Sequence, residues 1–176
     1  MPILALLLIA LSQTVPQRIV AAARDQVTWG TTYDPAYVRL AYPGGDVPRT
    51  KGVCTDVVIR ALRAVGHDLQ VLIHEDKKRR PAAYPRTPLD RNIDHRRVPS
   101  QMAFFRKHGR ALSLDSDWLP GDIVCWRLPS GRDHIGIVMD RRGTTGDWTV
   151  VHNLSRPAED DCLKSWTITG HFRYPR

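Results

Sequence analysis

The sequence lacks internal repeats, low-complexity linkers and any apolar run long enough to cross a bilayer as a helix. Without repeats or linkers, a chain of 176 residues has the size of one domain, and that length is enough to bury a hydrophobic core. Its hydrophobic content of 42% argues against disorder. We therefore expect a single folded domain.

The longest apolar run, from Ile3 to Leu11, lies at the N-terminus within "MPILALLLIALSQ". It is too short to span a bilayer but fits the hydrophobic region of a secretory signal, with small residues before a cleavage point after Ser12. A basic segment ahead of the run is missing, so an uncleaved apolar first helix is the alternative. We expect a signal peptide or apolar segment at 1–12, a domain at 13–176, and a periplasmic or secreted bacterial protein.

Acidic residues are few: 18 against 26 Lys and Arg, which gives a net charge of +8. Such a balance suits nucleic acid, an acidic membrane surface or a polyanionic cell envelope, and a well-solvated basic surface is the alternative. The sequence has no helix-turn-helix or zinc-finger spacing, so we expect no nucleic-acid partner and retain peripheral contact with an anionic envelope.

Cysteine is also scarce, with three residues: Cys54, Cys125 and Cys162. In an oxidising compartment Cys125 and Cys162 could form a disulfide and leave Cys54 free, as suits a reactive thiol. Two unpaired buried thiols are the alternative, because the sequence does not reveal the distance between them.

The expected helices lie in the first two thirds of the chain. Apolar residues recur at helical spacing in 16–27, and again from Cys54 onward, where Gly66 is the predicted stop. The polar stretch 74–99 is typical of an irregular crossing with a short helix, and part of it (75–98) is a candidate lid. A further helix is expected over 99–109.

From Asp122 onward the pattern changes to strands, in "DIVCWRL", "HIGIVMD", "DWTVVHN" and "SWTITGHFRY". Helices first and then consecutive strands at short spacing predict an α+β fold with a meandering antiparallel sheet.

Cys54 opens the second expected helix, directly after "KGV". Unpaired N–H groups and the helix dipole favour a thiolate at such a position, whereas Asp56 in the same first turn would raise the pKa of the thiol. Buried structural cysteines are common, so a packed thiol is the alternative, and a catalytic role requires a base.

His134 is the candidate base. Alternation along "HIGIVMD" places it on the face opposite Ile135, with Gly136 leaving space beside it. The segment "RRGTTG" predicts a hairpin to the next strand, in which His134 lies opposite either His152 or Asn153. Either partner could orient the imidazole as the third member of a Cys-His-polar triad.

These residues, in this order, resemble the NlpC-type, papain-like cell-wall cysteine peptidases. The resemblance rests on "YPGG", "GVC", "PGDIVCW", "HIGIV" and "VVHN". It implies a papain-like fold in which the nucleophile helix packs on the sheet, with Cys54 as nucleophile, His134 as general base and His152, or else Asn153, as the orienting residue. It also implies an oxyanion-hole role for Tyr42, with Tyr33 and Tyr37 as competing candidates.

The segments "TYDPAY", "GVCTDVVIRAL" and "NIDHRRVP" resemble, more narrowly, a YijF-like bacterial family of unknown function. The chain departs from the NlpC pattern on both sides of Cys54, where Val53 and Thr55 stand in place of the usual Asp and Ser, and in a long insert before His134. These departures bear on the choice of substrate.

Substrate binding is expected at charged residues of the insert, since arginine forks suit the free carboxylates of peptidoglycan peptides. The candidates are Asp94, His95, Arg96 and Arg97, together with Asp56.

We expect a monomeric cysteine hydrolase that cleaves an amide bond in peptidoglycan stem peptides and needs no cofactor. The alternatives are a noncatalytic envelope-binding module, an acyltransferase with the same triad, and a metal site formed by Cys54, His134 and His152.

Overall fold

A computed structural model describes residues 13–176, and the signal segment expected at 1–12 lies outside them. Within the described range no helix is both long enough and apolar enough to cross a membrane. Among residues 13–176, four α-helices precede most of the strands: α2 (Val15–Asp25), α3 (Cys54–Arg63), α4 (Leu69–Arg79) and α5 (Val98–His108).

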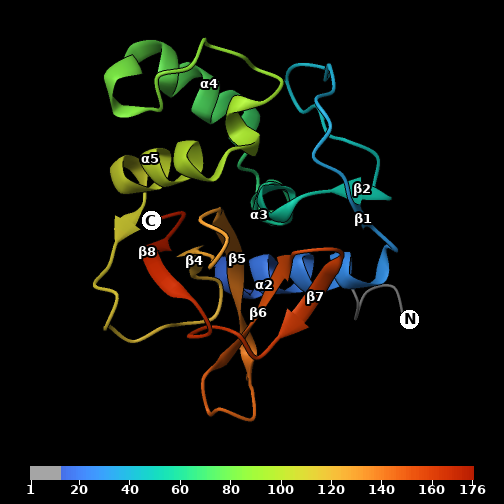
Figure 1. Ribbon diagram of the computed structural model, residues 1–176, viewed down its shortest axis with the longest axis vertical. Helices are drawn as coiled ribbons and strands as arrows, with labels where there is room; N and C mark the ends of the chain where they lie inside the picture. The colour runs from blue at the N-terminus through green and yellow to red at the C-terminus, as the bar shows by residue number, and fades with distance from the viewer. Residues whose placement is uncertain (1–12) are drawn as a thin grey trace.

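In the described part of the chain, the main sheet has six strands in the order β3-β8-β4-β5-β6-β7, and every pair in it is antiparallel. Neighbouring strands from β4 to β7 form a meander, while the last strand returns to lie between β3 and β4 (Figure 1). The strands are β3 (Arg110–Ala111), β4 (Ile123–Arg127), β5 (Asp133–Arg142), β6 (Trp148–Asn153), β7 (Pro157–Asp160) and β8 (Thr167–Arg173). The α+β fold predicted from the sequence is confirmed.

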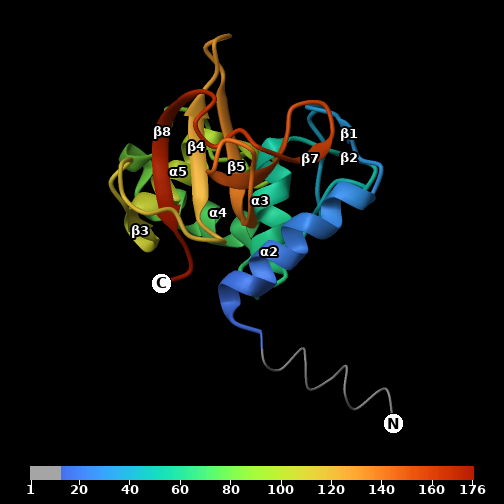
Figure 2. The same cartoon turned by 90° about the horizontal axis from the view of Figure 1, so that it is seen from below.

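Two hydrophobic clusters lie on the two faces of this sheet. Ile135, Ile137 and Met139 of β5 pack with residues of α2, α3, α4 and α5 in the larger cluster. Val138 of the same strand belongs to a smaller, tryptophan-rich cluster on the other face. The predicted alternation along β5 is therefore confirmed, because its odd-numbered residues face the helices. Figure 2 shows the sheet with these helices around it.

The polar insert is more ordered than expected. Helix α4 begins at Leu69, where the Asp68 side chain caps it by accepting from the Gln70 N–H at 3.1 Å. The helix continues through Arg79, so the first part of the segment expected to be an irregular crossing is regular helix. A short 3₁₀ turn, η3 (Asp94–Arg96), is also buried.

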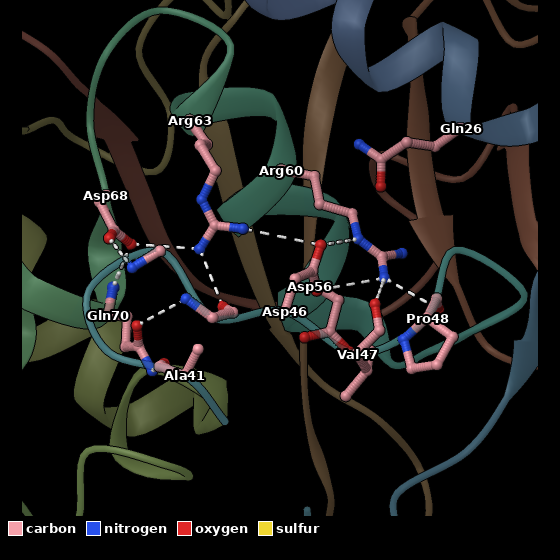
Figure 3. A network of polar contacts seen from close by, with 12 residues as sticks. Gln26, Ala41, Asp46, Val47, Pro48, Asp56, Arg60, Arg63, Asp68 and Gln70 are labelled. Atoms are coloured by element: carbon pink, nitrogen blue, oxygen red, sulfur yellow. Dashed lines mark hydrogen bonds and ion pairs between the residues drawn. The ribbon is translucent and has the colours of Figure 1, made fainter. Parts of the chain in front are cut away.

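The loop that leads to Cys54 is held by arginines of α3 (Figure 3). Arg60 donates to Asp46 Oδ2 at 2.9 Å and to the carbonyls of Val47 and Lys51 at 3.1 Å each. Arg63 donates to the Gly45 carbonyl at 3.1 Å. The loop ends in β2 (Lys51–Gly52), which pairs in parallel with β1 (Thr32–Tyr33), so Cys54 enters its helix from a fixed backbone.

Candidate active site

Cys54 is the first residue of α3 and lies with Ile135 in the larger hydrophobic cluster. Its residue surface is 6% exposed. The Asp56 carboxylate accepts from the Val53 N–H at 2.7 Å and so caps the start of the helix. The Ile135 N–H of β5 donates to the sulfur, which places the thiol against the backbone next to His134.

The pKa of the Cys54 thiol is raised to about 12. Burial is the largest cause, and the Asp56 carboxylate adds to it as the sequence predicted. Hydrogen bonds from the backbone N–H groups of Ile135, Thr55 and Cys54 itself act in the opposite direction. The direction of the shift is therefore the reverse of the one expected from a helix N-terminus alone, and Cys54 is a neutral thiol at pH 7.

The two histidines of the predicted constellation are joined. His134 Nε2 and His152 Nδ1 lie 2.9 Å apart, with both rings buried. His152 Nε2 in turn lies 3.1 Å from Asp160 Oδ2 at the end of β7. Burial, and then the charge of His152, lowers the pKa of His134 to about 3, so its imidazole is neutral and able to accept a proton. Burial also lowers the pKa of His152, with Asp160 opposing it.

The register that brings the histidines together differs from the predicted one. Gly136, and not His134, lies directly opposite His152. The difference is two residues from the register that pairs the histidines, so both stay on one face and meet diagonally. Gly136 permits this approach, because a Cβ there would come within 2.7 Å of Val150 Cγ1 and 3.1 Å of His152 Cβ.

Asn153, the other candidate for the orienting role, faces elsewhere. Its Nδ2 donates to the Gly52 carbonyl at 3.2 Å, two residues before Cys54. The arrangement thus distinguishes the two candidates: His152 contacts His134, whereas Asn153 ties the end of β6 to the strand that leads to the cysteine.

Cys54 and His134 lie toward opposite faces of the sheet, and no hydrogen bond joins them within the described residues. The ring of His134 stacks on Trp126 at 5.5 Å and meets Trp166 edge-on at 5.9 Å, within the cluster on the face away from α3. Cys54 belongs to the cluster on the helix face. His134 Nε2 is occupied by His152, so Nδ1 is the ring nitrogen that remains for a reacting group.

A pocket of about 390 Å³ opens at Cys54, and residues from separate parts of the chain form its walls. Tyr33 ends β1 and Pro35 lies in the loop after it, residues 96–99 run from the end of η3 into α5, and 131–133 run from the turn after β4 into β5. Ile93, Val53 and Val98 add apolar surface. The pocket is large enough for a peptide side chain and its flanking backbone.

The tyrosine beside the pocket is Tyr33. Burial raises its phenol pKa most, and the charge of Cys54 raises it further, which reflects their proximity. Tyr42 does not line the pocket; it lies edge-on to His74 of α4 at 5.5 Å. Tyr37 donates to Asp90 at 2.9 Å. The oxyanion role expected for Tyr42 is thus better matched by the position of Tyr33.

Three of the expected substrate-binding residues are occupied within the protein. Arg96 forms a bidentate pair with Asp56, through Nε to Oδ1 and Nη2 to Oδ2 at 2.9 Å each, and both side chains are 2% exposed. Asp94 is buried against Lys77 Nζ at 2.8 Å. These side chains fasten η3 to α3 and α4 and have no free fork for a ligand.

Of the remaining two, His95 is buried, and this burial lowers its pKa to about 4. Arg97 lines the pocket with 35% of its side chain exposed and donates to Asp94 Oδ1 at 3.1 Å.

The other sequence alternatives are resolved by the positions of the side chains. All three cysteines are free and buried, and Cys125 and Cys162 belong to the clusters on different faces of the sheet, so the disulfide considered from the sequence is not formed. Within residues 13–176, no group of three or more His, Cys, Asp and Glu side chains has the arrangement of a metal site, and Cys54 is not grouped with the two histidines.

The fold and the site define an α+β protein with a buried cysteine at a helix start and a buried histidine pair on adjacent strands. The chain belongs to the family described as a domain of unknown function, DUF1287, whose model matches residues 20–174. It is similar to the uncharacterized protein YijF of Escherichia coli (strain K12), with 48% identity over 165 residues, 89% of this chain and 80% of that protein. The narrower of the two resemblances noted in the sequence is therefore confirmed.

Proposed function

We propose that this protein is a cysteine hydrolase that cleaves an amide bond in peptidoglycan stem peptides, in the periplasm or outside the bacterial cell. The observation that carries the proposal is the buried His134–His152 hydrogen bond of 2.9 Å, which begins one residue after Asp133, a residue that lines the pocket of Cys54. A neutral imidazole with one nitrogen held by a second histidine has a fixed tautomer and a free nitrogen, as a general base requires.

In the proposed reaction, the Cys54 sulfur attacks the amide carbon while His134 Nδ1 takes the thiol proton. The tetrahedral intermediate then expels the amine, which receives that proton, and leaves a thioester. Water attacks the thioester, gives a proton to His134 and releases the carboxylic acid; the proton returns to the sulfur. In this proposal, the Cys54 N–H and the Tyr33 hydroxyl stabilise the oxyanion. No step requires a cofactor.

This chemistry requires the thiol and the His134 ring to come within hydrogen-bond reach when substrate fills the pocket. Catalytic contacts that are long in a free enzyme often shorten in the substrate complex. The resemblance of "GVC", "HIGIV" and "VVHN" to NlpC-type peptidases supports the same pairing. Val53 and Thr55, which replace the usual flanking residues, line the pocket and so bear on substrate choice.

The test is digestion of purified stem peptides, followed by mass spectrometry of the products. The wild-type protein is compared with Cys54→Ala, His134→Ala and Cys162→Ser. We expect cleavage by the wild type and by the Cys162 variant, whose thiol lies on the other face of the sheet, and at least a 100-fold loss, on the order of one general-base contribution, in the other two. A thioester adduct on the Cys54 peptide would identify the nucleophile. Equal products from wild type and Cys54→Ala would refute the proposal.

A noncatalytic envelope-binding module is the second candidate, and the raised pKa of the buried Cys54 thiol favours it. Its signature is sedimentation of wild type and Cys54→Ala with intact peptidoglycan to the same extent, with no product released by either. Products that carry an added amine, in the presence of excess amine acceptor, would instead indicate acyl transfer by the same triad.

A further inference from the structure

The charged groups around the Cys54 pocket are nearly all paired inside the protein. Arg96 is matched by Asp56, and Arg97 by Asp94. Asp133, which also lines the pocket, is held by Arg127 Nη2 at 3.0 Å.

Asp94 also pairs with the buried Lys77, so the positive side chains of Lys77 and Arg97 share this one carboxylate. The ion pairs in the pocket walls therefore leave no excess negative charge at this part of the pocket.

Arg132 is the exception. It lines the same pocket, and its guanidinium forms no hydrogen bond or ion pair with any residue of the described part of the chain. Its charge reaches the site, because it opposes the effects of burial and of Cys54 that raise the pKa of Tyr33. An unpaired guanidinium beside a nucleophile presents a planar set of donors that matches a carboxylate.

The turn that carries Arg132 is held by its own backbone. The Leu128 N–H donates to the Arg132 carbonyl at 2.9 Å, and the Gly131 N–H donates to the Leu128 carbonyl at 2.8 Å. Arg127 Nη1 donates to the Gly131 carbonyl at 2.9 Å. Gly131 has φ +79°, a conformation that glycine adopts readily, so the turn keeps its shape at the pocket wall. The position of Arg132 is thus fixed at the backbone, two residues before His134.

We propose that Arg132 makes the Cys54 pocket selective for ligands that carry a carboxylate next to the group that meets the thiol. As a statement about substrates, this rests on the proposed hydrolase function; as a statement about the pocket, it holds for any reagent that reaches Cys54. The residue was not among those predicted from the sequence, since one arginine in a turn resembles any solvated basic residue.

The pocket can be probed without turnover by two alkylating reagents of similar size, one of which is negatively charged and one neutral. Iodoacetate is an anion and iodoacetamide is neutral, and mass spectrometry of the Cys54 peptide measures each rate. The ratio of the two rates cancels any change in thiol pKa, since both reagents react with the same thiolate. Wild type is compared with Arg132→Gln, Arg132→Lys and Arg110→Gln, the last an exposed arginine of β3 outside this pocket.

We expect Arg132→Gln to lower the iodoacetate-to-iodoacetamide ratio about fivefold, the factor expected for one partly screened charge pair. Arg132→Lys should keep most of the wild-type ratio, and Arg110→Gln, which removes the same net charge elsewhere, should leave it unchanged. Added salt at about 0.5 M should bring the wild-type ratio toward that of Arg132→Gln.

An unchanged ratio in Arg132→Gln, or an equal fall in Arg110→Gln, would overturn the proposal. So would a Cys54 that neither reagent modifies, because no ligand of that size would then reach the thiol. Should Arg132→Gln fail to fold, the salt series on the wild type decides the same question. The hydrolase proposal is tested separately by peptide cleavage. If no peptide is cleaved, that proposal is wrong, but the ratio of alkylation rates still tests the role of Arg132.

Discussion

Two opposing effects act on the thiol of Cys54, and their sizes decide its state. A helix N-terminus stabilises a negative charge by about 0.3–1 kcal/mol. Burial is the main cause of a rise in the thiol pKa from 9.0 to about 12, which corresponds to roughly 4 kcal/mol against the thiolate. Burial therefore prevails, and any catalysis at Cys54 begins from a neutral thiol and a neutral His134.

From the neutral state of both groups we expect His134 to be needed for peptide cleavage but not for the alkylation of Cys54 in the free protein. Alkylation of Cys54 by iodoacetamide should be slow at pH 7.5 and rise steadily up to at least pH 10, because only the thiolate reacts and its pKa is raised to about 12. His134→Ala should leave that pH profile unchanged, since the ring forms no hydrogen bond with the thiol in the described residues, yet it should abolish peptide cleavage.

The measurement is the rate of modification of the Cys54 peptide from pH 5 to pH 10, with Cys162→Ser as the control. A plateau of fast alkylation below pH 7 that His134→Ala removes would show a preformed thiolate–imidazolium pair and contradict the neutral state.

Local sequence patterns predict some residues of this site and not others. Cys54, His134 and His152 could be selected because each stands in a local pattern of known meaning. Asp160, which contacts His152, has no such pattern: it ends a short strand and resembles a solvated acid. Tyr33 could not be preferred over Tyr42, because the proximity of Tyr33 to Cys54 depends on how the chain folds back after β1.

The periodicity of apolar residues is the strongest indication of the helices and strands in this sequence. It predicts α3, α5, the strands β4, β5, β6 and β8 and the two faces of β5, since each is a regular pattern closed by a turn or a glycine, whereas the short strand β7 is not predicted. Both predicted registers are wrong, the one that pairs His134 with His152 by two residues and the one that pairs it with Asn153 by one. The pairing of β5 and β6 shifts between Val138 and Arg142, and hairpin length alone does not reveal such an irregularity. Helix α4 was missed because its cap, Asp68, resembles any loop acid.

The Asp56–Arg96 pair fastens the first turn of α3 to η3, two elements 40 residues apart in sequence. Asp56→Ala should lower the free energy of unfolding by about 3–5 kcal/mol, because it leaves a buried guanidinium without a partner. Urea denaturation followed by circular dichroism measures the change.

Lys51→Ala is the matched control, since Lys51 pairs with Asp34 at the surface with 55% of its side chain exposed and should cost at most about 1 kcal/mol. Asp56→Leu combined with Arg96→Met removes both charges and should recover part of the loss. A cost for Asp56→Ala no larger than that of Lys51→Ala would show that water reaches the guanidinium.

For the molecule as a whole, the sheet separates two cores, and both contain buried histidines with lowered pKa values. His134 lies among the tryptophans on one face, and its pKa is lowered to about 3. His95 lies in the buried 3₁₀ turn beside α3 and α4, and its pKa is lowered to about 4. Burial is the largest cause in each case, so both parts of the fold disfavour the charged imidazole.

This shared property predicts acid sensitivity. Between about pH 6.5, the ordinary pKa of histidine, and the folded values of about 4 for His95 and about 3 for His134, the unfolded chain binds protons that the native protein does not. The stability that the neutral imidazoles contribute is therefore fully present above pH 6.5. It decreases as the pH falls through this window, by about 1.4 kcal/mol per pH unit for each histidine.

Urea denaturation at intervals from pH 7.5 to pH 4 measures this decrease, and His95→Gln should make it shallower by removing one of the buried histidines with a lowered pKa. Cys162→Ser, which keeps all seven histidines of the chain, should show the wild-type dependence. If stability were constant down to pH 4.5, the imidazoles would have to be charged or solvated in the native state. His134 could then not act as the neutral base that the proposed hydrolysis needs, so the unfolding curve also tests the active site.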